Sequence, residues 1–342
     1  HFGCWLAPLI NMTAWNEIDF KTIGMAGWNE KDFASATAKK LENPSAVGRR
    51  RALEDLTTLD RTALQPHVGT LANILQSCND WGARRLVLEV LLKLEEMDLK
   101  PHLDSIMMQV TSSDSNVQIM ALRVLKKMGP MELQRHAHLV VSELQASHVP
   151  LVHCTALEVL KNMDPADLGP HASSIMKHLD KFQAFEVLNK LASFELEPHV
   201  EAIVEKMNMS PDPLVCFRAL EILGKINSCE LKPYTGKIVK QLTRLRDSGV
   251  ERAAVELLRK LDPAEVKLYV EDLVDQLNTC SDSARRSRLL EVMRNIEPTD
   301  LKPFVGDTVK RLESSPDFVV QGWSLEVQRR SLHASLREMR QR

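Results

Sequence analysis

Two kinds of titratable residue recur along this chain at nearly constant spacing, and both could do chemistry. Histidines occupy corresponding positions of a repeated pattern, namely His67, His102, His136, His171 and His199. A neutral imidazole binds metals and acts as a general base. Glutamates recur in a similar way, and carboxylates bind cations or act as acids and bases. A metal site or an acid–base site is therefore the first chemistry that the sequence suggests.

The pattern around the histidines argues against a metal. Three further copies of it carry Tyr234, Tyr269 and Phe304 instead. Because phenylalanine has no ligand atom, we expect a planar side chain that packs between neighbouring repeats. One alternative stays open, the crowded group of His136, His138, His148 and His153. We predict no metal and no cofactor.

The glutamates also have a structural explanation. Four of them have a lysine four residues on, in the pairs Glu89 with Lys93, Glu186 with Lys190, Glu221 with Lys225, and Glu256 with Lys260. Exposed pairs in this order stabilise a helix by about 0.2–0.5 kcal/mol each. The chain holds no G-x-x-x-x-G-K, G-x-G-x-x-G, H-E-x-x-H or G-x-S-x-G motif and no nucleophile with a recognisable partner. We therefore predict no catalytic residue and no enzyme activity.

The elements that position these residues follow from the repeat. Its signature has four positions: a Leu or Val, any residue, a Pro or the residue that replaces it, and then the His, Tyr or Phe named above. The Leu or Val stands at positions 64, 99, 133, 168, 196, 231, 266 and 301, in steps of 35, 34, 35, 28, 35, 35 and 35. A fixed period of this size is typical of a solenoid, in which each repeat buries its apolar face against its neighbours.

The residue pattern within each repeat predicts two helices. Apolar residues follow the signature Pro at +2, +5, +6 and +9, as in Val68, Leu71, Ala72 and Leu75, and they form one helical stripe. A polar turn leads into a second helix with an Ala-Leu-Glu motif. The apolar fraction of 44% with only 5% aromatic residues suits stacked helices. We predict an all-α fold, a right-handed α-solenoid of about eight to nine two-helix repeats of ~35 residues over residues 45–342.

The start of the second helix carries a family resemblance. It reads Val117-Gln118-Ile119-Met120-Ala121-Leu122 in one repeat and Val215-Cys216-Phe217-Arg218-Ala219-Leu220 in another. With the Ser/Asp-rich turn before it, this resembles the HEAT repeat over roughly Pro44 to Arg342, although most repeats here lack the Arg that HEAT repeats often carry after that Val. The resemblance implies a scaffold that binds protein partners.

Two alternatives to a protein-binding scaffold stay open. Residues 156–170 have a spacing similar to pentatricopeptide repeats, which bind single-stranded RNA. Some HEAT-like families are enzymes, such as bilin lyases and alkylpurine glycosylases, so a HEAT-like lyase is the remaining catalytic alternative.

Composition limits the partners and the compartment. A net charge of -2 gives no long-range field for a polyanion, so nucleic-acid binding is not favoured. The six cysteines are scattered without a C-x-x-C spacing, which indicates reduced thiols in a reducing intracellular compartment. No stretch is apolar enough to span a bilayer, which leaves a soluble protein or peripheral membrane association. Because residue 1 is His, we expect a processed form or a fragment, in the cytosol or inside an organelle such as a plastid or mitochondrion.

One repeat is shorter than the rest. The interval from Leu168 to Leu196 lacks seven residues, and alignment places the deletion between Leu179 and Ala184, where the turn between the helices belongs. We expect shortened or fused helices and a bend of the solenoid near residues 180–184.

The two ends differ from the middle. Residues 1–44 are predicted as an irregular, aromatic-rich segment that caps the solenoid or tethers it to a partner, with these candidate contact residues: Phe2, Trp5, Trp15, Phe20, Trp28 and Phe33. Residues 328–342 are predicted to form a helix, either a solvated terminal cap or a docking element for an acidic surface, phosphate or lipid headgroups. Its candidate contact residues are Arg329, Arg330 and Arg337. Two arginine runs at the starts of second helices, residues 49–51 and 285–288, could extend this basic strip.

The sequence therefore predicts a non-catalytic scaffold or accessory subunit. It would bind other proteins, as part of a larger complex, through the solenoid surface and the N-terminal segment.

Overall fold

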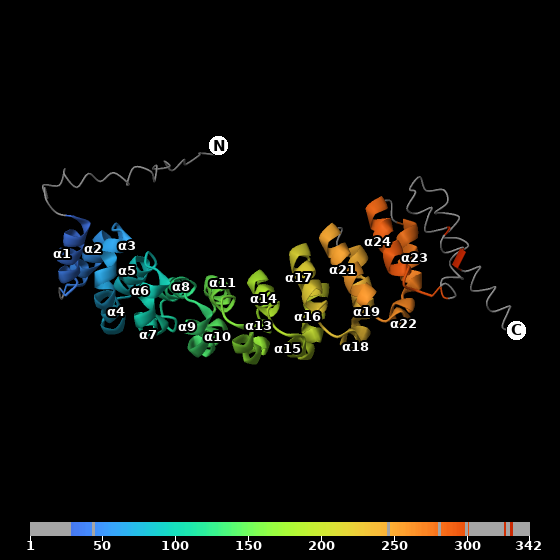
Figure 1. The fold of residues 1–342 in the computed structure, drawn as a ribbon, viewed down its shortest axis with the longest axis horizontal. Coiled ribbons are helices and arrows are strands. Elements are labelled where there is room, and N and C mark those ends of the chain that lie inside the picture. The colour runs from blue at the N-terminus through green and yellow to red at the C-terminus, as the bar shows by residue number, and fades with distance from the viewer. Residues whose placement is uncertain are drawn as a thin grey trace, which may run out of the picture. The chain divides into compact units, whose positions relative to one another are not determined.

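The computed structural model describes residues 29–42, 45–244, 247–279, 282–297, 300, 325 and 329–330. All regular elements in these ranges are helices, which confirms the all-α solenoid class. The chain divides into unit 1, residues 1–127, and unit 2, residues 128–342. In both units the helices follow one another in series (Figure 1).

Unit 1 holds the first repeats. Its helices are α1 (Glu30–Lys40), α2 (Ala46–Thr57), α3 (Arg61–Leu64), η2 (Gln65–His67), α4 (Val68–Ser77), α5 (Trp81–Leu91), α6 (Glu96–Leu99), η3 (Lys100–His102), α7 (Leu103–Met107) and α8 (Ser115–Leu125). The second helices α2, α5 and α8 pack side by side, and the first helices α4 and α7 do the same.

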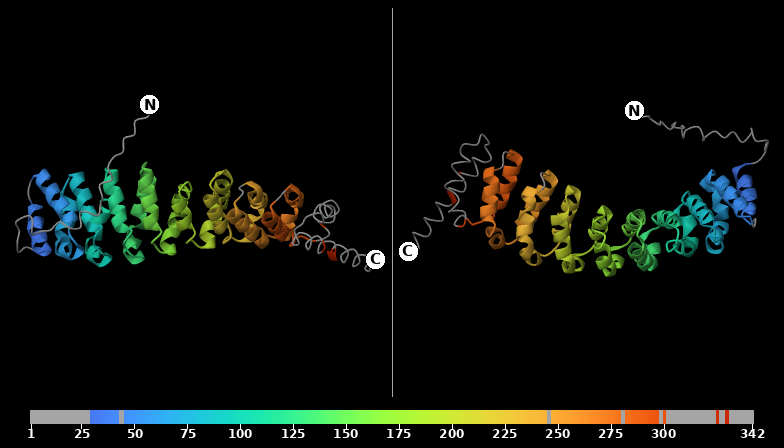
Figure 2. Two further views of the ribbon diagram at one scale, coloured as in Figure 1. Left: turned by 90° about the horizontal axis from the view of Figure 1, so that it is seen from above. Right: turned by 180° about the vertical axis from the view of Figure 1, so that it is seen from behind.

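Unit 2 repeats this arrangement. Its helices are α9 (Pro130–Leu133), η4 (Gln134–His136), α10 (Ala137–Ala146), α11 (Pro150–Leu160), α12 (Pro165–Leu168), η5 (Gly169–His171), α13 (Ala172–Met176), α14 (Phe182–Leu188), α15 (Ser193–Leu196), η6 (Glu197–His199), α16 (Val200–Met209), α17 (Pro213–Leu223), α18 (Ser228–Leu231), η7 (Lys232–Tyr234), α19 (Thr235–Val239), α20 (Gln241–Arg244), α21 (Ser248–Lys260), α22 (Pro263–Lys267), α23 (Val270–Thr279) and α24 (Ser283–Met293). The second helices α11, α14, α17, α21 and α24 form one row in contact with one another (Figure 2).

The signature forms the junction between repeats. Its Leu ends a four-residue helix and is fully buried, as at Leu99. The next three residues, as in η3, make one 3-10 turn. Pro has no backbone N–H, and at the start of a helical turn that N–H would have no partner inside the helix, so Pro is tolerated there. The main part of the first helix starts directly afterwards, at Leu103. The Pro therefore lies just before the first helix and not inside it.

The ring of the signature packs against the preceding repeat. A side-chain carbon on Gly69 would lie 3.7 Å from the His102 ring. A side-chain carbon on Gly236 would lie only 2.6 Å from the ring of Tyr269, so glycine makes room for the larger ring. At these junctions the prediction of a planar side chain between neighbouring repeats is confirmed.

The short repeat loses length from its second helix as well as from the turn. Helix α14 has seven residues, where α11 and α17 have eleven each. Four of the seven missing residues are therefore the first turn of that helix. The Arg218 guanidinium of α17 lies 5.3 Å from the Phe182 ring at the shortened end. Shortened helices are confirmed, and the bend near residues 180–184 stays a prediction.

The N-terminal boundary differs from the expectation. Residues 1–44 were expected to be irregular, but α1 covers residues 30–40 and buries Ala34 and Ala38 against the array. Asn29 caps this helix by accepting a hydrogen bond from the Asp32 amide at 2.9 Å. The helical array therefore begins by residue 30, and the aromatic residues before it lie outside the described residues.

Candidate partner-binding groove

A row of lysines joins successive second helices. Each donates from Nζ to a backbone carbonyl at or just after the end of the preceding second helix: Lys93 to Leu59 at 3.1 Å, Lys127 to Leu94 at 2.8 Å, Lys190 to Lys161 at 2.9 Å, Lys225 to Asn189, and Lys260 to Gly224 at 3.2 Å. A cation at a helix C-terminus interacts favourably with the helix dipole and with carbonyls that have no partner inside the helix. These contacts, here called the lysine ladder, hold neighbouring repeats in register.

The predicted pairing of glutamates with lysines inside one helix is wrong, because the lysines make the lysine ladder and three of the glutamates pair with other residues. Glu89 pairs with Arg85 at 3.1 Å, Glu186 with Lys161 at 2.9 Å, and Glu221 with Arg218 at 2.7 Å. The lysine ammonium groups go to the preceding repeat instead, because the carbonyls at a helix end have no partner inside the helix.

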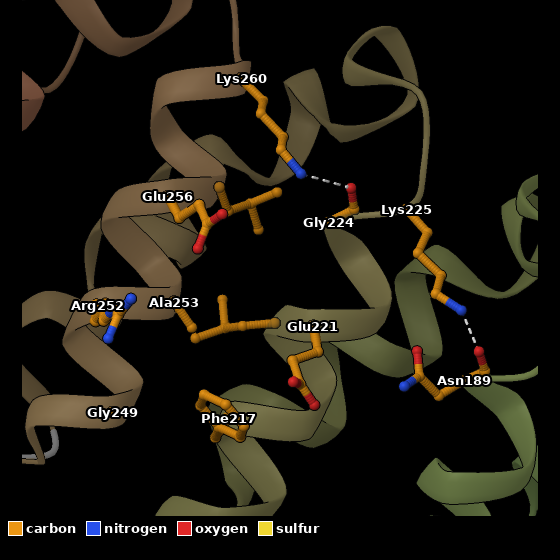
Figure 3. A pocket seen from close by; sticks show the side chains of 12 residues that line it. Asn189, Phe217, Glu221, Gly224, Lys225, Gly249, Arg252, Ala253, Glu256 and Lys260 are labelled. Carbon is orange, nitrogen blue, oxygen red and sulfur yellow. Dashed lines mark hydrogen bonds between the residues drawn. The ribbon is translucent and has the colours of Figure 1, made fainter.

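A groove of about 580 Å³ opens on the face of the second helices in unit 2. Its walls are α17 and α21, and the end of α14 closes one side. Leu220 and Leu257 are buried in its floor, and the half-buried ring of Phe217 lies near one end. Figure 3 shows Lys225 and Lys260 toward the other end.

Small residues make this groove. Gly224, Gly249 and Ala253 line it where a larger side chain would project into the space. Gly224 ends α17 in an ordinary right-handed conformation, φ -63 and ψ -14, so its backbone does not require glycine. The groove therefore exists because of the side chains that are missing there.

The rim of the groove is charged. Lys225 and Lys260 are held in place by the lysine ladder, and each ammonium keeps two further N–H donors. Arg252 is exposed, and neither it nor Glu256 has an ion-pair partner among the described residues. An apolar floor with a charged rim is typical of a surface that binds another molecule.

The candidate residues named from the sequence do not gather at this groove. Phe2, Trp5, Trp15, Phe20, Trp28 and Arg337 lie outside the described residues. Phe33 lies half-buried in α1, in unit 1. Arg329 is exposed, and Arg330 donates to the Arg294 carbonyl at 3.1 Å, in the manner of the lysine ladder.

The two arginine runs do not form a free basic strip. Arg50 pairs with Asp80 at 2.5 Å, between α2 and α5. Arg288 lies 2.5 Å and Arg285 3.4 Å from Glu251, a carboxylate that is 5% exposed. These ion pairs join neighbouring second helices, so the predicted extension of the basic strip is wrong at these three arginines.

The histidines do not assemble into a metal site in the described part of the chain. His153 donates from Nε2 to the Ser147 carbonyl oxygen at 2.6 Å, so the Nε2 atom carries the proton. The His153 ring lies 4.7 Å from the His178 ring. Burial, and then the nearby His153, lower the pKa of His178. Within the described ranges, no group of three or more His, Cys, Asp or Glu could hold a metal ion.

Four cysteines within the described ranges are free thiols: Cys78, Cys154, Cys216 and Cys229. Burial raises the pKa of the Cys216 thiol, which disfavours the reactive thiolate. Of the helices in the described ranges, none has the length and apolar character needed to cross a membrane.

Comparison with known proteins shows the fold alone. No protein-family model matches the chain, and no curated protein matches its sequence. An engineered protein of known structure is similar over 92% of this chain and 90% of its own length, with 20% identity and a TM-score of 0.57. The karyopherin Kap121p, solved bound to RanGTP, is similar over 83% of this chain with 16% identity and a TM-score of 0.51. This chain covers only 36% of Kap121p, so it corresponds to about a third of that protein.

The groove residues were not predicted from the sequence. The signal that could have found them is a comparison of the second helices position by position. Gly224 stands where an earlier repeat has Leu92, and Ala253 stands where another has Met120. Two losses of volume on facing helices predict a gap between them.

Proposed function

We propose that this protein is a non-catalytic scaffold that binds a partner protein in the groove between α17 and α21. The observation that carries the proposal is the combination of a buried apolar floor, Leu220 and Leu257, with rim charges held in fixed positions. Solenoids present extended surfaces of this kind to partners. The N-terminal aromatic segment, residues 1–28, is proposed as a second contact.

The proposal includes membership of a larger complex in a reducing intracellular compartment. Free thiols at Cys78, Cys154 and Cys216 are consistent with such a compartment. The RNA-binding alternative finds less support, because a net charge of -2 gives the chain no long-range field for a polyanion.

The test is the native size of the protein in a gently prepared extract of its source cells, with co-eluting proteins identified. Ala253→Met would place in the groove the side chain that unit 1 carries at the same repeat position. We expect the wild type to elute in a reproducible assembly, well above its mass of 38.7 kDa, and Ala253→Met to lose most of it. Deletion of residues 1–28, which leaves α1 in place, should weaken the assembly as well.

Met120→Ala is the matched control, because it changes the corresponding position in unit 1 in the opposite direction. It should leave the assembly unchanged. The proposal is wrong if the wild type elutes alone, or if Ala253→Met, shown by circular dichroism to be folded, assembles as the wild type does.

A further inference from the structure

We infer that the groove between α17 and α21 takes a short, extended, acidic peptide with one apolar anchor residue. This rests on the proposed function, because it assigns the partner class for the same groove. Three observations carry it: the length of the groove, the position of its apolar floor, and the balance of charge on its rim.

The length of the groove suits an extended segment. Its lining residues on α21 run from Gly249 to Lys260, which is about 16 Å along a helix that rises 1.5 Å per residue. An extended chain covers that distance with about five residues at 3.3 Å each. The volume of about 580 Å³ is within the range of sites that enclose small ligands or short segments.

The apolar and charged parts of the groove are separated along its length. Phe217 and Lys225 are eight residues apart on and just after α17, which is roughly 12 Å. That distance corresponds to about four residues of extended chain. A peptide with its apolar side chain against Phe217 would therefore bring a residue four positions away to Lys225 and Lys260.

The charge balance along the whole rim favours a carboxylate. The rim has three cations, Lys225, Arg252 and Lys260, and the carboxylates Glu221 and Glu256. Arg218 lies 2.7 Å from Glu221 and offsets its charge, which leaves Glu256 against three cations. Because backbone carbonyls hold both lysines in position, a bound carboxylate would meet ammonium groups that need no reordering.

The experiment measures binding of labelled synthetic peptides to the full chain at low salt. The acidic probe is Glu-Glu-Ser-Ser-Ser-Leu-Ser-Ser-Ser-Glu-Glu, in which either chain direction brings two Glu to the lysine end. One counterpart has Lys for every Glu, and another has Ser for Leu. The acidic probe should bind about tenfold more tightly than either counterpart, and its affinity should fall as salt is added.

Arg252→Glu is the decisive variant, because the fold does not use the Arg252 side chain for any described contact. It should weaken the acidic probe by about tenfold with an unchanged melting temperature. Arg123→Glu makes the same charge change on α8 of unit 1, outside the groove, and should have no effect on the probe. Lys260→Gln, which keeps a donor for the Gly224 carbonyl but removes the charge, should weaken binding by a smaller factor.

The outcomes separate this inference from the proposed function. Equal or tighter binding of the lysine probe, no binding of the acidic probe, or an Arg252→Glu variant that binds normally would each overturn the acidic class. In those cases an assembly that is sensitive to Ala253→Met would still support the groove as a partner site. If the acidic probe binds as expected while the assembly ignores Ala253→Met, the proposed function fails and the peptide site remains.

Discussion

The helix pair α5 and α8 in unit 1 and the pair α17 and α21 in unit 2 share the contacts that hold their two helices together, here called the frame. The two pairs differ in the side chains on their surface. In both pairs a lysine at or just after the end of the later helix donates to a carbonyl just after the earlier one, Lys127 to Leu94 and Lys260 to Gly224. The floor positions also correspond, since Leu88 and Leu220 are both buried. The helices are therefore held together in the same way.

The difference lies in three facing positions. Gly224, Gly249 and Ala253 of the second pair correspond to Leu92, Asn116 and Met120 of the first. These changes remove side-chain volume from the second pair. The comparison teaches that a groove can open between two helices of a solenoid where smaller residues replace larger ones.

The largest effect should come from breaking the common frame. Leu88→Ala and Leu220→Ala each remove a buried side chain, and each should cost about 2–4 kcal/mol of local stability. Because repeats open in part independently, the measurement is amide hydrogen exchange in α5 and α17, with the wild type as reference. A cost below about 1 kcal/mol at either position would show that the two frames are not equivalent.

The frame was accessible from the sequence, since the period and the apolar stripes are local patterns that repeat many times. The packing role of the signature ring could also be predicted from the sequence, because Tyr or Phe replaces histidine at this position in three repeats. The lysine ladder did not, because Lys93 and Glu89 lie four residues apart in the sequence and look like a pair within one helix. Their actual partners depend on how the next repeat stacks, and a single helix carries no information about that stacking.

The extent of the helical array at the N-terminus was misjudged for a related reason. Helix α1 has a polar composition, and its buried face consists of Ala34, Thr37 and Ala38. Small side chains give a weak periodic signal, yet they allow α1 to approach α2 closely.

Removing one contact of the lysine ladder should have an intermediate effect. Lys93→Met and Lys225→Met each leave a helix-end carbonyl without its cation, and each should cost about 0.5–1 kcal/mol. Thermal unfolding at low salt is the measurement. Substitution by Arg, which keeps the charge and a donor, should restore most of the loss.

The two lysine variants also sharpen the comparison. Lys225→Met should lose affinity for the acidic probe in addition to stability, whereas Lys93→Met should lose stability alone. Equal loss of probe binding in both variants would mean that the acidic peptide does not recognise the unit 2 groove.

The smallest effect on stability should come from filling the groove at its glycine. Gly224 and Leu92 end their helices with nearly the same backbone, φ -63 and ψ -14 against φ -60 and ψ -21. Gly224→Ala should therefore be tolerated, with a gain of up to about 0.5 kcal/mol from the less flexible unfolded chain. The new carbon would lie 3.3 Å from the Glu221 carbonyl oxygen, a tight contact that limits the gain. If the melting temperature is unchanged or slightly raised and the acidic probe binds more weakly, the glycine at this position is needed to keep the groove open. A marked loss of stability would show instead that the glycine is needed for the packing of α17.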